Sequence, residues 1–195
     1  MNKENSLAEY KRKRSFGQTP EPSGKKRKKS GTPPIFVIQK HDASSLHYDF
    51  RLEIGGVLVS WAVPKGPSTD PKEKRLAMRT EDHPMEYADF EGVIPEGEYG
   101  AGRVMVWDTG TYRKLEEKQG KQKTMEQSLE DGHITVWLEG RKLKGGYAIT
   151  RLGQGKRWLL VKMRDDKTDA RRNPVKTEPK SILSGRSIEE LKTEG

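Results

Sequence analysis

Residues 41–53 read HDASSLHYDFRLE, and polar and apolar side chains alternate strictly from His47 to Glu53. This alternation predicts a strand with two unlike faces, because successive side chains of a strand point to opposite sides. The polar face holds His47, Asp49, Arg51 and Glu53. His41 precedes a short turn, so the strand can gather two imidazoles, a carboxylate and a guanidinium on one patch.

Two imidazoles and one carboxylate form a mixed nitrogen and oxygen ligand set. Such a set suits Mn, Fe, Co or Zn better than Ca or Mg, and its open positions can take water or a substrate oxygen. Arg51 adds a planar guanidinium that matches phosphate. Histidines on a solvated strand face are the plainer alternative, and the carboxylate and guanidinium on the same face favour the site.

Further short strands joined by glycine turns are expected on both sides of this stretch. Gly55-Gly56 predicts a two-residue hairpin turn, and Thr109-Gly110 predicts another tight turn. The expected strands are residues 35–40, 46–54, 57–63, 76–80, 103–108, 111–115, 133–139, 147–152 and 157–163, with a short helix at 125–129. This mostly β pattern predicts an antiparallel barrel or a strongly bent sandwich.

Basic charge is concentrated in the first 33 residues, which hold +7 of the net charge of +9. Because lysine and arginine runs flank a segment with proline and glycine, we expect residues 1–33 to form a largely flexible arm. Such an arm contacts nucleic acid through counterion release, or it is a solvated tail. Residues 34–164 are the expected barrel domain, and residues 165–195 are an expected polar tail in which Ser187 caps a short helix.

The composition excludes several classes of protein. The chain has no cysteine, so disulfides, thiolate metal sites and a cysteine nucleophile are excluded. No apolar run approaches the ~20 residues needed to span a bilayer, and the charged N-terminus differs from a secretory signal. We expect a cytoplasmic protein without a membrane partner.

Two further segments carry candidate functional residues. His83 precedes a proline that keeps it out of a helix, so it lies in a loop or at a strand end. There it can ligate a metal, transfer a proton or donate to phosphate, and a surface histidine is the plainer alternative. Residues 90–102 are rich in glycine and predict a tight loop that braces the site, with phosphate binding by its amides as the alternative. Lys65 and Arg75, taken alone, resemble solvated surface charges.

Three long segments together resemble the 3′-phosphoesterase domain of bacterial DNA ligase D. They read FVIQKHDASSLHYDFRLE from residue 36, VLVSWAVPKGPS from residue 57 and EDHPMEYADFEGVIPEGEYGAGRVMVWDTGTY from residue 81. The likeness runs from about residue 7 to about residue 163. It implies a small antiparallel β-barrel with a crescent-shaped groove. Because no polymerase or ligase sequence is present, we expect a stand-alone form of the domain.

The resemblance implies a manganese-dependent enzyme, with Co²⁺ or Zn²⁺ as alternative ions, that processes DNA 3′ ends in nonhomologous end joining. Its implied substrate is a DNA primer-template that ends in a 3′ ribonucleotide or a 3′-phosphate. A phosphodiesterase step removes the terminal ribonucleoside, and a phosphomonoesterase step leaves a 3′-hydroxyl for ligation. A separate repair polymerase and a DNA ligase are the implied partners, and the implied location is cytoplasmic, associated with the nucleoid.

Position by position, the resemblance implies the metal ligands His41, His47 and Asp49. The implied catalytic and phosphate-handling residues are Arg51, His83, Tyr87, Lys65, Arg75 and Glu81. Among these, the two basic residues Lys65 and Arg75 are tied mainly to the monoesterase step. In the arm, Arg14 and Glu21 match positions that support activity, and Ser15 stands where the family often has aspartate.

Two other hypotheses stay open. A non-catalytic module that binds nucleic-acid ends in a repair complex needs phosphate-gripping cations but no metal-ligand cluster. A general RNA or cyclic-phosphate phosphodiesterase would share the cluster and act on free single strands. The nucleophile also stays open: a metal-bound water is expected for the monoester step, and a ribose 2′-hydroxyl is a candidate for the diester step.

Overall fold

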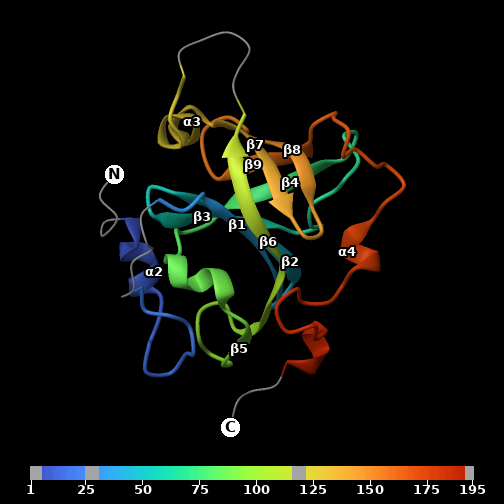
Figure 1. The fold of residues 1–195 in the computed structure, drawn as a ribbon. Coiled ribbons are helices and arrows are strands. Elements are labelled where there is room, and N and C mark those ends of the chain that lie inside the picture. Colours follow the sequence, from blue (N-terminus) through green and yellow to red (C-terminus); the bar gives the residue numbers. More distant parts are fainter. Residues whose placement is uncertain (1–5, 25–30, 116–121, 192–195) are drawn as a thin grey trace.

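The computed structural model describes residues 6–24, 31–115 and 122–191 of the chain. Within these residues, nine strands form one antiparallel sheet in the order β1-β2-β3-β4-β9-β8-β7-β6-β5. Because β1 also pairs with β6, all strands except β5 close into an eight-stranded barrel (Figure 1). The predicted antiparallel β-barrel is therefore confirmed.

The strands are short apart from β6. Their bounds are β1 Ile35–Asp42, β2 Leu46–Ile54, β3 Val57–Val63, β4 Lys74–Arg79, β5 Gly92–Ile94, β6 Gly102–Lys114, β7 His133–Gly140, β8 Lys144–Arg151 and β9 Arg157–Lys162. The helical elements are α2 Ala8–Arg12, α3 Met125–Asp131, α4 Pro174–Thr177 and the 3-10 helices Met85–Asp89 and Ile188–Glu190. No helix in these described ranges is long and apolar enough to cross a membrane.

Several predicted turns and caps are present. Gly55 and Gly56 both have positive φ, 61° and 79°, as a two-residue hairpin between β2 and β3 requires. The helix predicted at 125–129 is α3, which begins with a capping box formed by Thr124 and Gln127. Ser187 caps a short helix near the C-terminal end as predicted, and this helix is the 3-10 helix Ile188–Glu190.

The prediction of a tight turn at Thr109-Gly110 is wrong. Residues 102–114 form the single strand β6, and Gly110 lies opposite Phe36 of β1 and Gly140 of β7. A Cβ at Gly110 would collide with the carbonyl oxygen of Glu139. Glycine therefore serves here to let two backbones approach each other rather than to reverse the chain.

The apolar face of β2 points into the barrel, where Tyr48, Phe50 and Leu52 are buried with the main core. The polar face of β2 is buried as well, since Asp49 and Arg51 are only 6% and 2% exposed. That face is therefore not an open, solvated surface of the sheet.

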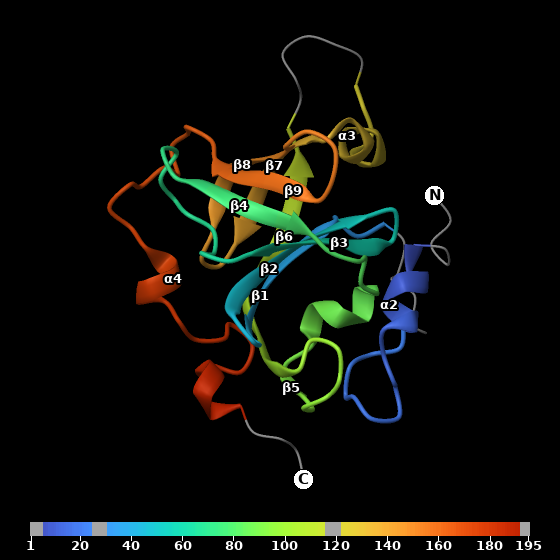
Figure 2. The ribbon, with the colours of Figure 1, turned by 180° about the vertical axis from the view of Figure 1, so that it is seen from behind.

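The outer side of the barrel is covered by the N-terminal segment and the 3-10 helix Met85–Asp89. These two elements lie side by side next to β3 (Figures 1 and 2). A second apolar cluster fills this outer layer and includes Tyr10 and Tyr87, against Val37, Leu58 and Val106 of the sheet.

The described part of the predicted flexible arm, residues 6–24, packs on the barrel through buried Leu7 and Tyr10. The basic run at residues 25–29 lies outside the described residues, so the expected flexibility of that run stays a prediction. At the other end of the chain, the polar tail lies along the barrel: the indole of Trp107 donates to the carbonyl of Glu178 at 2.8 Å.

Candidate metal and phosphate site

The pairing of β1 with β2 places His41 directly opposite His47. Their ring centroids lie 4.8 Å apart. The carboxylate of Asp49 is next to both rings, with Oδ2 3.6 Å from Nδ1 of His41 and Oδ1 3.7 Å from Nε2 of His47. One ligand atom from each residue can be chosen so that all three lie within 4.8 Å of one another, a spacing that a single cation can bridge.

Backbone carbonyls fix which imidazole nitrogen faces the carboxylate. Nε2 of His41 is 2.8 Å from the carbonyl oxygen of Gly100, and Nδ1 of His47 is 2.9 Å from that of Ser45. Because a carbonyl can only accept, each of these nitrogens carries the proton. In the neutral form of each ring, which is the form that binds a metal, the nitrogen left as a ligand is then Nδ1 of His41 and Nε2 of His47, and both of these face Asp49.

The charge of Asp49 is compatible with this arrangement. Burial alone would raise the pKa of Asp49, but the guanidinium of Arg51, whose Nη2 lies 3.1 Å from Oδ2, outweighs it and holds that pKa well below its usual value. The carboxylate is therefore ionised at neutral pH. Two imidazoles, which bind metals in their neutral form, and one carboxylate make a donor set that fits a transition-metal dication.

Arg51 is held from three sides. Its Nε donates to Oε1 of Gln39 at 2.8 Å, its Nη1 to Oγ of Ser60 at 2.8 Å, and its Nη2 to Oδ2 of Asp49 at 3.1 Å. Gln39 and Ser60 lie on the neighbouring strands β1 and β3. The guanidinium thus has a fixed direction before any phosphate arrives, which lowers the entropic cost of binding one.

His83 is placed by a short bridge to the barrel, in which its backbone exchanges two hydrogen bonds with Leu58. Nδ1 of His83 donates to the carbonyl of Glu81 at 2.9 Å, and Nε2 lies 3.3 Å from Nη2 of Arg14. Burial, together with Arg51 and Arg14, lowers the pKa of His83 well below its usual value. His83 is therefore neutral, with Nε2 as an acceptor.

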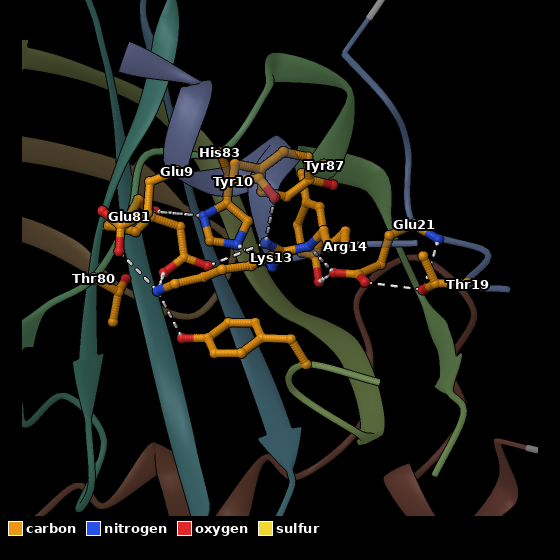
Figure 3. A network of polar contacts seen from close by, with 12 residues as sticks. Glu9, Tyr10, Lys13, Arg14, Thr19, Glu21, Thr80, Glu81, His83 and Tyr87 are labelled. Atoms are coloured by element: carbon orange, nitrogen blue, oxygen red, sulfur yellow. Dashed lines mark hydrogen bonds and ion pairs between the residues drawn. The ribbon is translucent and has the colours of Figure 1, made fainter. Parts of the chain in front are cut away.

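The N-terminal segment closes this side of the site with buried ion pairs (Figure 3). Arg14 Nε contacts Oε1 of Glu21 at 2.8 Å, and its Nη1 contacts Oε1 of Glu81 at 3.2 Å. The hydroxyl of Tyr87 donates to the same oxygen of Glu21 at 3.0 Å. These contacts join the segment to the loop that carries His83.

Eight of the eleven predicted site residues meet in one hollow of about 260 Å³. It is lined by the metal-ligand set and by charged and aromatic neighbours, with smaller residues between them. Its predicted members are His41, His47, Asp49, Arg51, His83, Tyr87, Glu81 and Arg14, and its other members are Ala43, Ser44, Ala62, Thr80, Ile94, Tyr99 and Gly100.

Three predicted residues lie outside this lining. Glu21 is buried behind Arg14. Lys65 is exposed just after β3, and Arg75 on β4 forms an ion pair with Glu73 at 2.9 Å. Their proposed parts in the monoester step therefore stay predictions. The supporting residues Gln39 and Ser60 and the carbonyl of Gly100 were not predicted.

Known proteins resemble this chain in the region that carries these site residues. A family model described as the DNA ligase D 3′-phosphoesterase domain matches residues 39–151, more than half of the chain. That stretch contains the metal-ligand cluster, Arg51 and His83.

Curated relatives match nearly the whole chain. The multifunctional non-homologous end joining protein LigD of Pseudomonas aeruginosa is 50% identical over 188 residues, which cover 93% of this chain and 22% of that protein. The corresponding proteins of Mycobacterium tuberculosis and Mycolicibacterium smegmatis are 45% and 46% identical over 161 residues, 83% of this chain. The chain therefore spans about a fifth of the length of these relatives.

Proposed function

Because the chain belongs to the family of DNA ligase D 3′-phosphoesterase domains, we propose that it is a metal-dependent phosphoesterase that processes the 3′ ends of DNA. One observation carries this proposal: the His41–His47–Asp49 cluster shares a single hollow with the phosphate-matching groups Arg51 and His83. A module that only binds DNA has no use for the metal-ligand cluster.

The proposed substrate is a primer-template whose primer ends in a ribonucleotide or a 3′-phosphate. The diesterase step removes the terminal ribonucleoside, and the monoesterase step leaves a 3′-hydroxyl. The relatives are named for non-homologous end joining, so we place this chain in that process. A separate polymerase and a DNA ligase are its proposed partners, at the bacterial nucleoid.

His41, His47 and Asp49 would hold the metal, for which Mn²⁺ is our proposal and Co²⁺ and Zn²⁺ are the alternatives. When bound, such an ion polarises a phosphate oxygen and offsets the charge that develops there. The chain's own contribution is to present unprotonated Nδ1 of His41 and Nε2 of His47 toward an ionised carboxylate.

Arg51 and His83 position the phosphate in this proposal. Arg51 adds a fixed positive charge next to the cluster, and its three side-chain contacts prevent it from turning away. Neutral His83 accepts through Nε2 in the free protein. A phosphate beside that nitrogen favours the imidazolium, so His83 can then donate to a phosphate or leaving oxygen.

Activity on defined 3′ ends, measured across several divalent metals, tests the proposed function. The wild-type protein should convert a ribonucleotide-tailed primer to a 3′-hydroxyl in the presence of Mn²⁺. His47→Ala and Asp49→Ala should abolish this conversion while circular dichroism shows that the fold survives. The matched control is His133→Ala, because His133 is an exposed histidine on β7, outside the hollow.

Two results would count against the proposal. Near-wild-type hydrolysis in both site variants would remove the metal role. A gel shift of the primer-template without cleavage in any metal would favour the end-binding module. Comparison of a recessed duplex end with free single-stranded RNA separates the proposed enzyme from a general phosphodiesterase.

A further inference from the structure

Tyr99 is an exposed aromatic residue at the edge of the hollow. It lies in the glycine-rich loop between β5 and β6 and is 46% exposed. The other tyrosine that lines the hollow, Tyr87, is 2% exposed, and its hydroxyl is bound to Glu21. Of the two tyrosines among the described residues that line the hollow, Tyr99 is therefore the one whose ring is accessible to a ligand.

Tyr99 lines the same hollow as the metal-ligand cluster. The following residue, Gly100, accepts the hydrogen bond that orients His41. A phosphate held by the cluster would therefore lie in the hollow that Tyr99 lines. A nucleoside esterified to that phosphate would bring its base to the same edge of the hollow.

The N-terminal segment steadies the ring from the other side. Nζ of Lys13 donates to the hydroxyl of Tyr99 at 3.2 Å and lies 4.5 Å from the ring centroid. The guanidinium carbon of Arg14 lies 5.4 Å from the same centroid. These contacts reduce the motion of an otherwise exposed ring and so lower the cost of stacking a base on it.

We propose that Tyr99 is the stacking platform for the nucleobase of the 3′-terminal nucleoside. This assignment deepens the proposed function and rests on it. Stacking accepts all four bases because every base has a π-face, so the platform would select for the presence of a base rather than for its identity. It would also distinguish an end that carries a nucleoside from an end that carries only a phosphate.

Paired substrates test the platform. One primer ends in a complete ribonucleotide, and the other ends in an abasic ribose with the same phosphodiester. For the wild-type protein, we expect a higher kcat/KM on the complete end. Tyr99→Leu should reduce this ratio about tenfold, within the range known for stacking of a base on an aromatic ring. Tyr99→Phe, which keeps the ring, should retain the ratio.

A binding measurement gives a readout that does not require hydrolysis. A primer with 2-aminopurine as its terminal base, added to the Asp49→Ala protein, should lose fluorescence on binding because stacking quenches this base. The quenching should persist with Tyr99→Phe and disappear with Tyr99→Leu in the same background.

Three outcomes decide the proposal. Equal loss by Tyr99→Leu on the complete and abasic ends would overturn the platform and leave Tyr99 a support for the loop. Unchanged quenching in Tyr99→Leu would overturn it as well. Ring-dependent quenching without hydrolysis of either end by the wild-type protein would support the platform and reject the proposed reaction.

Discussion

Arg14, on the segment that follows α2, lies 3.3 Å through Nη2 from Nε2 of His83, a residue 69 positions later in the chain. The same guanidinium contacts the carboxylates of Glu21 and Glu81. The N-terminal segment therefore supplies part of the wall of the site, and it holds that wall in place with charges that are shielded from water.

Removal of this guanidinium should release the segment. Arg14→Ala removes the guanidinium from the buried carboxylates of Glu21 and Glu81 and leaves Glu81 with Lys13 at 3.3 Å. The loss of one partner of a buried ion pair costs several kcal/mol when the structure cannot relax. Because the segment can instead swing away, we expect amide hydrogen exchange at residues 8–13 to accelerate at least tenfold while the barrel strands keep their protection. The proposed diesterase activity should fall in parallel.

Lys11→Ala is the matched control for this experiment, because Lys11 is an exposed basic residue of α2, three positions before Arg14. Slow exchange at residues 8–13 in Arg14→Ala, equal to that in Lys11→Ala, would show that the apolar contacts of Leu7 and Tyr10 hold the segment without Arg14.

How much of this site could be predicted depends on the range of the contacts involved. The alternation in residues 47–53 and the short turn after His41 are local, so they predict that the two imidazoles and Asp49 share a face. The contacts of Arg51 with Gln39 and Ser60 join three strands, and they follow only from the register of both hairpins. Local sequence does not determine that register.

The same limit explains the wrong turn prediction at Gly110 and the burial of two residues in the N-terminal segment, which was not predicted. Gly110 has the sequence context of a turn, but its glycine is needed because β7 comes close, which is a contact between distant segments. Leu7 and Tyr10 are three residues apart, a helical spacing, yet the basic residues around them suggested a mobile arm. Their burial depends on the surface that the barrel and the 3-10 helix Met85–Asp89 offer.

Acidification should lower the free energy of unfolding, because His83 is buried in its neutral form. Its pKa in the folded protein lies well below 6.5, mainly because of burial. The unfolded chain therefore binds a proton that the folded protein excludes, and stability falls as the pH drops below 6.5, by up to about 1.4 kcal/mol per pH unit. His83→Gln should flatten this slope in urea unfolding between pH 6.5 and 5. His133→Gln should leave it steep, and an equal slope in all three proteins would contradict the buried neutral state.

The glycine-rich loop should tune metal affinity through the orientation of His41. Gly102 has φ of 140°, and a Cβ there would collide with the carbonyl oxygen of Asp42. Gly102→Ala should displace the loop and the Gly100 carbonyl, and so weaken Mn²⁺ binding about 10–100-fold, the usual cost of losing such a supporting contact. Isothermal titration calorimetry measures the change.

Gly153→Ala serves as its control. Gly153 also has positive φ, and a Cβ there would meet no atom within 4 Å, so the variant carries the backbone strain without disturbing the site. Equal Mn²⁺ affinity in both variants would show that the loop does not orient His41.

Metal binding should also stabilise the fold, because the three ligands are brought together by the pairing of β1 with β2 and do not form a site in the unfolded chain. At a free Mn²⁺ concentration 100 times the Kd, the gain is about 2.7 kcal/mol, which for a chain of this size raises Tm by roughly 5–11 °C. We expect EDTA to reverse the shift and His47→Ala to remove it, as measured by differential scanning calorimetry. A shift of equal size in His47→Ala would place the stabilising ion elsewhere, whereas His133→Ala should keep the wild-type response.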